Sequence, residues 1–346
     1  MPGCFRVRDF SPLAACCDTL EELWAAACRA YDDDADSSAV LQQAAAVLLK
    51  FVVDNHAENQ TAIVAAGAIP RLVRLLGAAS KGEVQQAAAD ALWSLSKNHA
   101  DNQAAVVAAG AVPHLVGLLG AGSSEYVQQV AAGALQHLAE NHAENQTAIV
   151  AAGAIPHLVE LLGADSPEES QQAAAETLRS LTDSHADNQA GIAAAGAIPR
   201  LVRLLGADAD DQSPKRAAAD ALQDLARDHA ANQSAIVAAG AAPPLVRLLG
   251  SDCGTAVQQA AAEALQHLAA GHAENQTSIV AAGAFPHLVR LLGADSPGEV
   301  QQDHHRSSLT VHLTMALRLY TSKMVTVLSF PCAAATNIWR GAKNRP

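Results

Sequence analysis

The chain has 346 residues and a formal net charge of −13, and half of its residues are apolar although only 3% are aromatic. Alanine, leucine and valine supply most of the apolar content, which favours closely packed helices and argues against a β-sandwich. Residues 303–346 hold six Lys and Arg against one Asp, a net of +5, which leaves −18 on the first 302 residues. So acidic a surface argues against nucleic acid and anionic membranes as partners, and it favours basic proteins.

The first 58 residues are predicted to form an N-terminal cap and a truncated first repeat. Residues 12–30 have helical composition, and an acidic stretch over residues 32–38 separates them from a second helix over residues 40–53. Charged residues interrupt the start, so no signal peptide is visible, and the six cysteines show neither metal-binding nor disulfide spacing. We therefore expect reduced thiols in a cytoplasmic or nuclear protein.

Residues 59–302 repeat one pattern with a period of 43 or 44 residues. An Asn-Gln pair precedes a single glycine in each copy, and a proline follows that glycine by three residues. A period this regular is typical of stacked repeats that share a continuous core. We predict five full repeats and one partial repeat in this range. The marker glycines are Gly67, Gly110, Gly153, Gly196, Gly240 and Gly283.

Each full repeat is predicted to contain a short, a medium and a long helix. In the first copy the short helix covers residues 59–66, opened by an acidic or Asn residue as N-cap and closed by the marker glycine. The second helix has proline in its first turn, where the missing N–H has no helical partner, and ends at another glycine. The third helix runs from residue 83 to about residue 97, with Ala88, Leu92 and Leu95 as its buried stripe.

This triplet, with a glycine after its first helix and a proline opening its second, resembles the armadillo repeat. The resemblance is carried by residues 145–156, which read Asn-Gln-Thr-Ala-Ile-Val-Ala-Ala-Gly-Ala-Ile-Pro. The sequence of this segment is similar to that of the repeats in plant, algal and fungal scaffold proteins. The resemblance covers residues 40–302 and implies an all-α, right-handed α-solenoid whose third helices line a concave, peptide-binding groove. We expect a monomeric, non-catalytic scaffold that binds other proteins without a cofactor.

An alternative within the same family is a cargo adaptor for nuclear transport. Such adaptors carry Trp on the third helix and, one turn later, Asn, and these two ladders hold a basic extended peptide. Neither residue occurs at any matching position, so the sequence argues against this role. The Trp positions hold Val47, Asp90, Gly133, Glu176, Asp220 and Glu263. The Asn positions hold Phe51, Ser94, His137, Ser180, Asp224 and His267.

A largely acidic row replaces those ladders. Residues four apart share one helix face, so the row is expected along one side of the solenoid. We interpret it either as an ordinary solvated face or as a groove for a basic or polar extended segment of a partner, held by charge complementarity. The candidate groove residues are Asp90, Ser94, His137, Glu176, Ser180, Asp220, Asp224, Glu263 and His267.

The remaining patterns predict neither a catalytic nor a metal site. One histidine recurs per repeat, but neighbours in stacked repeats lie roughly 10 Å apart, whereas zinc ligands bind at about 2 Å. We expect each histidine to cap a third helix or to bond the next repeat's backbone, and each Asn to act as an N-cap and bond a neighbouring loop. No phosphate-binding glycine loop, GxSxG or HExxH motif is present. The recurring histidines are His56, His99, His142, His185, His229 and His272.

The repeat stops after Gln302, where Asp303-His304-His305 replaces the expected alanine triplet. We predict a divergent tail over residues 303–346, with a capping helix from about residue 307 to residue 327, a disordered basic end and no transmembrane segment. Because the break falls inside a repeat, we hypothesise a misassigned exon or a frameshift. An mRNA that encodes this tail in frame would exclude that hypothesis.

Overall fold

The computed structural model describes residues 43–47, 49–50, 57–77, 82–182, 185–207, 212–250 and 253–293. Regular structure within these ranges is entirely helical, which confirms the predicted all-α class. Most of the predicted N-terminal cap and the whole tail over residues 303–346 lie outside the described residues. The chain divides into two compact units, Met1–Ile279 and Val280–Pro346. The five complete helix triplets belong to the first unit, and the described part of the second contains α20 (Ala284–Gly293).

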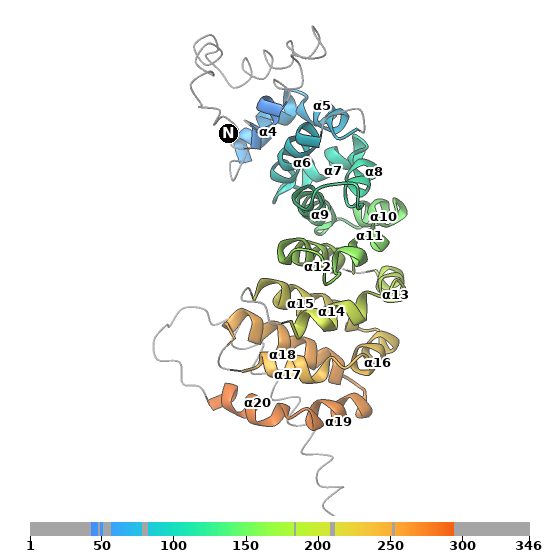
Figure 1. The fold of residues 1–346 in the computed structure, drawn as a ribbon, viewed down its shortest axis with the longest axis vertical. Helices are drawn as coiled ribbons and strands as arrows, with labels where there is room; N and C mark the ends of the chain where they lie inside the picture. Colours follow the sequence, from blue (N-terminus) through green and yellow to red (C-terminus); the bar gives the residue numbers. More distant parts are fainter. Residues whose placement is uncertain are drawn as a thin grey trace, which may run out of the picture. The chain divides into compact units, whose positions relative to one another are not determined.

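The described part of the first unit holds five copies of a helix triplet (Figure 1). The first helices are α4 (Ala57–Ala65), α7 (Ala100–Ala108), α10 (Ala143–Ala151), α13 (Ala186–Ala194) and α16 (Ala230–Ala238). The second helices are α5 (Ala68–Leu75), α8 (Ala111–Leu118), α11 (Ala154–Leu161), α14 (Ala197–Leu205) and α17 (Ala242–Leu248). The third helices are α6 (Gly82–Ser96), α9 (Glu125–Ala139), α12 (Glu168–Thr182), α15 (Ser213–Ala226) and α18 (Thr255–Ala269), and α19 (Ala273–Ala281) follows the last of them.

The third helices pack against one another in a row. Each contacts the next, from α6 to α9, α12, α15 and α18, and these are the most extensive contacts between helices (Figure 1). The predicted stripe of α6, Ala88, Leu92 and Leu95, is fully buried. Small alanine side chains in this stripe allow neighbouring helices to approach closely. The fold is therefore an armadillo-type α-solenoid, in which each triplet buries its leucines against its neighbours.

Each turn between a first and a second helix depends on a glycine with a positive φ. Gly110, between α7 and α8, has φ 82°. A side chain at this φ would be strained, which explains why glycine recurs there at the repeat period. Pro113 lies in the first turn of α8, where its missing N–H costs no helical hydrogen bond. Both residues stand where the sequence predicted the boundary between the two helices.

Amide side chains pair with the backbone carbonyl groups at the C-terminal ends of the third helices. From α7, Asn102 Nδ2 donates to the carbonyl oxygen of Leu95 (2.9 Å), and Gln103 Nε2 donates to that of Ser96 (3.0 Å). These carbonyls have no partner within α6, and a buried carbonyl left unpaired would be costly. The same two bonds join α10 to α9, α16 to α15 and α19 to α18.

The second helices end in the same way. Gln128 Nε2 of α9 donates to the carbonyl oxygen of Gly120, just beyond the end of α8, at 2.9 Å. The equivalent glutamines Gln85, Gln171 and Gln258 bond Gly77, Gly163 and Gly250. The long helices α6, α9, α12 and α18 therefore each bond the end of the helix before them, as first helices do for the third helices.

The prediction that asparagine acts as N-cap is wrong. The first helices begin two residues earlier than expected, so Asn102 is the third residue of α7 and its amide turns back to α6. Nδ1 of His99 accepts a hydrogen bond from the N–H of Asn102 at 3.4 Å, and His229 accepts one from Asn232 at 3.3 Å. These two histidines thus bond the next repeat's backbone, which was one of their two predicted roles. The N-cap position itself is held by His99, His142, His185 and His229.

Replacing Asn145 by alanine should lower the free energy of unfolding by about 1–3 kcal/mol, because the carbonyl of Leu138 would stay buried without its 2.8 Å partner. Urea unfolding followed by circular dichroism measures this difference. Thr147→Ala in the same helix is the control, since the Thr147 side chain is exposed and the change should stay within about 0.5 kcal/mol. Equal losses in the two variants would contradict a specific role for the amide.

Candidate functional site

The predicted groove residues all lie on the third helices, at two positions one turn apart. Because the third helices stack in a row, the structure brings these positions together along one face, which we call the third-helix face. Asp90, Ser94 and Ser180 are buried on this face, whereas the other six side chains are partly exposed. Helix by helix, they are Asp90 and Ser94 on α6, His137 on α9, Glu176 and Ser180 on α12, Asp220 and Asp224 on α15, and Glu263 and His267 on α18.

Asp90 is already bound by two neighbours. Lys50 Nζ lies 3.0 Å from its Oδ1, and the Tyr126 hydroxyl donates to the same oxygen at 3.1 Å. The carboxylate is only 6% exposed and its charge is matched by Lys50. Asp90 therefore differs from the exposed, solvated carboxylate that the sequence led us to expect. Because Lys50 neutralises its charge, it does not attract a cationic partner.

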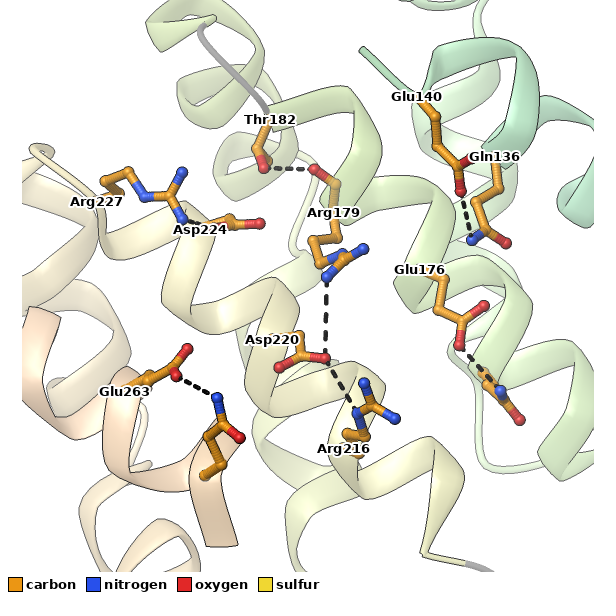
Figure 2. Close-up of polar contacts among 12 residues, drawn as sticks. Gln136, Glu140, Glu176, Arg179, Thr182, Arg216, Asp220, Asp224, Arg227 and Glu263 are labelled. Atoms are coloured by element: carbon orange, nitrogen blue, oxygen red, sulfur yellow. Dashed lines mark hydrogen bonds and ion pairs between the residues drawn. The ribbon is translucent and has the colours of Figure 1, made fainter. Parts of the chain in front are cut away.

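Glutamine–glutamate pairs four residues apart follow the same face on other helices (Figure 2). Gln172 Nε2 donates to Glu176 Oε1 at 2.9 Å in α12, and Gln259 Nε2 donates to Glu263 Oε1 at 2.8 Å in α18. A glutamine amide orients a carboxylate but does not neutralise it. Among the described residues, no cation pairs with Glu176 or Glu263. These two carboxylates are therefore oriented, partly exposed and uncompensated.

Asp220 on α15 lies between two arginines (Figure 2). Its Oδ2 is 3.7 Å from Nε of Arg216 in the same helix and 4.0 Å from Arg179 on α12. Burial raises the pKa of Asp220 from 3.8 to about 6 even though both arginines oppose that shift. The nearby carboxylates of Asp224 and Glu263 raise it further. Asp220 therefore changes charge under mildly acidic conditions.

A second ion pair, at the C-terminal end of α15, joins Arg227 to Asp224, 2.5 Å apart. On the neighbouring α18, burial lowers the pKa of His267, and the Arg227 charge lowers it further although nearby carboxylates oppose this effect. A neutral imidazole next to Arg227 adds no positive charge to the face. The net charge of this part of the face is therefore set by its carboxylates and arginines.

Sequence reasoning missed two aromatic residues on the third-helix face. Trp93 on α6 stacks on His137 of α9, with ring centroids 6.2 Å apart and an angle of 12° between the ring planes. Tyr126, which is 43% exposed, reaches Asp90 from the first turn of α9. With only 3% aromatic residues in the chain, an aromatic residue on each of two stacked third helices was the available signal.

Other chemistry is limited in the part of the chain that the structure describes. No group of three His, Cys, Asp or Glu side chains in these ranges is placed to hold a metal ion. None of the described helices combines the length and the apolar character of a membrane span. The described residues thus offer the third-helix face as the place where polar and aromatic side chains converge.

The stability of the protein should depend on pH through Asp220. Its pKa is higher in the folded protein than in the unfolded chain, so its contribution to the free energy of unfolding falls as pH rises from about 4 through about 6. Asp220→Asn removes this loss, and relative to the unmodified protein it should gain about 1 kcal/mol between about pH 5 and about pH 7.5. Urea unfolding at both pH values measures the gain. Glu144→Gln, at an exposed carboxylate of α10, is the control, and parallel pH profiles for Asp220→Asn and the unmodified protein would contradict the assignment.

Comparisons with known proteins agree with this geometry. Residues 56–97, 99–140 and 142–183 match the family model described as Armadillo/beta-catenin-like repeat. Each matched range encloses one triplet, from α4–α6 to α10–α12. A comparison with curated proteins found no match.

Among solved structures, the chain is similar to an engineered protein, with 32% identity over 85% of this chain and 71% of that one, and a TM-score of 0.72. It is also similar to a computationally designed armadillo repeat protein for modular peptide recognition, with 27% identity over 72% and 98% of the two chains and a TM-score of 0.63. A designed armadillo repeat protein in complex with the peptide (KR)4 is 26% identical over 72% and 98% of the chains, with a TM-score of 0.61. Taken with the five stacked triplets, these matches show that the chain belongs to the armadillo-repeat family.

Proposed function

We propose that this protein is a non-catalytic interaction scaffold whose third-helix face binds a basic, extended segment of another protein. Armadillo repeats, and the designed relatives made for peptide recognition, support a protein-binding role. The finer part of the proposal, the face and the charge of the partner, rests on the side chains of α12, α15 and α18.

The uncompensated carboxylates of Glu176 and Glu263 are the observation that carries the proposal. Each is oriented by a glutamine and partly exposed, so a partner's cation could reach it without first displacing a cation of this protein. Asp220 and Asp224, in contrast, already have arginine partners. We therefore place the strongest attraction for a basic segment at α12 and α18, with α15 between them contributing less.

The spacing of the repeats suits an extended chain. Packed helices lie roughly 8–10 Å apart, and an extended chain rises about 3.3 Å per residue. Carboxylates on successive third helices would therefore meet every second or third residue of a partner. The designed relative with the alternating peptide (KR)4 supports the same kind of partner for this chain.

The proposal also includes a monomer that works in the cytoplasm, or in the nucleus, without a cofactor and without nucleic acid as partner. Cys253 is a free, partly exposed thiol, which is typical of a reducing compartment. The negative charge of the chain opposes binding to nucleic acid.

Binding of a fluorescently labelled (KR)4 peptide tests the proposal. Glu176→Gln and Glu263→Gln should each weaken binding by about two- to five-fold, because each removes one charge pair and keeps the size of the side chain. Added salt should weaken binding of the peptide to the unmodified protein more than to a variant that carries both Glu176→Gln and Glu263→Gln. Fluorescence anisotropy at several salt concentrations measures both effects.

The matched controls are Glu144→Gln on α10 and Glu274→Gln on α19, which remove the same charge from exposed carboxylates of first helices. We expect these two variants to bind the peptide as the unmodified protein does. If they weaken binding as much as the third-helix variants, the attraction comes from overall charge and the proposed face is wrong.

A further inference from the structure

We propose that the part of the third-helix face formed by α6 and α9 is a subsite for one arginine side chain of the partner segment, stacked on Trp93. This inference rests on the proposed function, because it assumes that the segment lies along the third helices. It adds a chemical distinction to that function: carboxylates alone accept lysine or arginine, whereas this subsite selects arginine.

The first observation is that Trp93 takes the place of a missing side chain. Where α6, α12, α15 and α18 carry a carboxylate, α9 carries Gly133. A Cβ at Gly133 would lie 3.2 Å from Nε1 of Trp93 and 3.6 Å from its Cδ1. The indole therefore covers the spot where the row of carboxylates is interrupted. A partner that follows the row meets a partly exposed aromatic ring there in place of a carboxylate.

The second observation is that this ring stacks on an imidazole that in turn contacts a carboxylate. Trp93 stacks on His137, and Nδ1 of His137 lies 3.2 Å from Oε2 of Glu140. Gln136 Nε2 donates to the other oxygen of Glu140 at 3.1 Å. The hydrogen bond from His137 holds the pKa of Glu140 below its usual value, so this carboxylate stays ionised. An aromatic face with an ionised carboxylate near it offers a guanidinium both a stacking surface and a hydrogen-bond acceptor.

The third observation is that the neighbouring charges leave room for one cation. Asp90 is neutralised by Lys50 and held by Tyr126, so it does not attract a partner. Among the described residues, Glu140 forms no ion pair with a Lys or Arg, and the one arginine whose charge acts on it is Arg179 of α12. Tyr126 lies two turns before Gly133 on α9, and its exposed ring borders the same face.

Arginine fits this arrangement better than lysine does. Its guanidinium is planar, weakly hydrated and able to stack on an indole while it bonds a carboxylate, whereas the ammonium of lysine is a compact, strongly hydrated charge. A cation stacked on an aromatic ring at a partly exposed site contributes about two- to five-fold in affinity.

An oligolysine peptide and its variants with a single arginine at each position in turn test the subsite. One position should bind about two- to five-fold more tightly than oligolysine. Trp93→Leu should remove this preference, so that the arginine-containing peptides bind this variant no more tightly than oligolysine does. Glu263→Gln should weaken every peptide and leave the preference intact. Citrulline at the preferred position, which is planar but neutral, should bind no better than lysine.

Tryptophan fluorescence provides a readout at the subsite itself. In a protein carrying Trp24→Phe and Trp339→Phe, the emission comes from Trp93 alone. The peptide with arginine at the preferred position should change this emission more than oligolysine does at equal occupancy. Trp93→Phe, which keeps a ring over Gly133, should retain part of the preference, and circular dichroism verifies that both Trp93 variants are folded.

The outcomes separate this inference from the proposed function. If oligolysine binds and depends on Glu263, but arginine gives no advantage at any position, the subsite is wrong and the basic-segment groove stands. A preference that persists in Trp93→Leu, or that citrulline matches at the preferred position, also overturns the arginine subsite. If neither oligolysine nor any arginine-containing peptide binds, both proposals fail.

Discussion

The structure depends on one recurring interaction, the hydrogen bond from a buried amide side chain to a carbonyl group at the end of the preceding helix. Helices leave their last carbonyl groups without partners, and a chain of short helices has many such ends. Here the next helix supplies the donors, as Asn145 and Gln146 do for the end of α9. The helices of a triplet are therefore joined by directed polar bonds in addition to apolar contact.

This interaction has a functional consequence, because it fixes the position of each third helix. When α6, α9, α12, α15 and α18 are held in one row, side chains at the repeat period come to one face. Because equivalent positions of successive repeats lie on this face, a different residue type at such a position gives that part of the face a different chemistry. On α12 and α18 the side chains are oriented carboxylates, and between α6 and α9 they are an indole and an imidazole.

The sequence predicted the helix triplets, the glycine turns and the buried alanine and leucine stripe, because each follows from a local pattern repeated many times. It failed for Asn102, because N-cap preference is a local property whereas the actual partner of that side chain lies on another helix. The sequence also did not predict that Asp90 is buried. Lys50 and Tyr126, which surround that carboxylate, lie 40 and 36 residues away in the chain, and only stacking brings them together.

Trp93 was missed for a related reason. Comparing the equivalent positions of successive repeats shows only that Gly133 has no side chain where other repeats have a carboxylate. That the indole of Trp93 covers this position follows from the packing of α6 against α9.

The repeat that is one residue longer than the others shows that the register of the third-helix face is kept while the connections between helices vary. Gly196 and Gly240 are 44 residues apart, one more than the usual step. In α15, Lys215 stands at the place of the glutamine that bonds the end of the second helix in the other four repeats. In the same region Gln189 donates to the carbonyl oxygens of Asp224 and Arg227 at the C-terminal end of α15, and not to the helix before it. Asp220 nevertheless stays 43 residues before Glu263, on the same face. Since the extra residue precedes Asp220 in the chain, the insertion changes how the helices are joined and leaves the third-helix face in register.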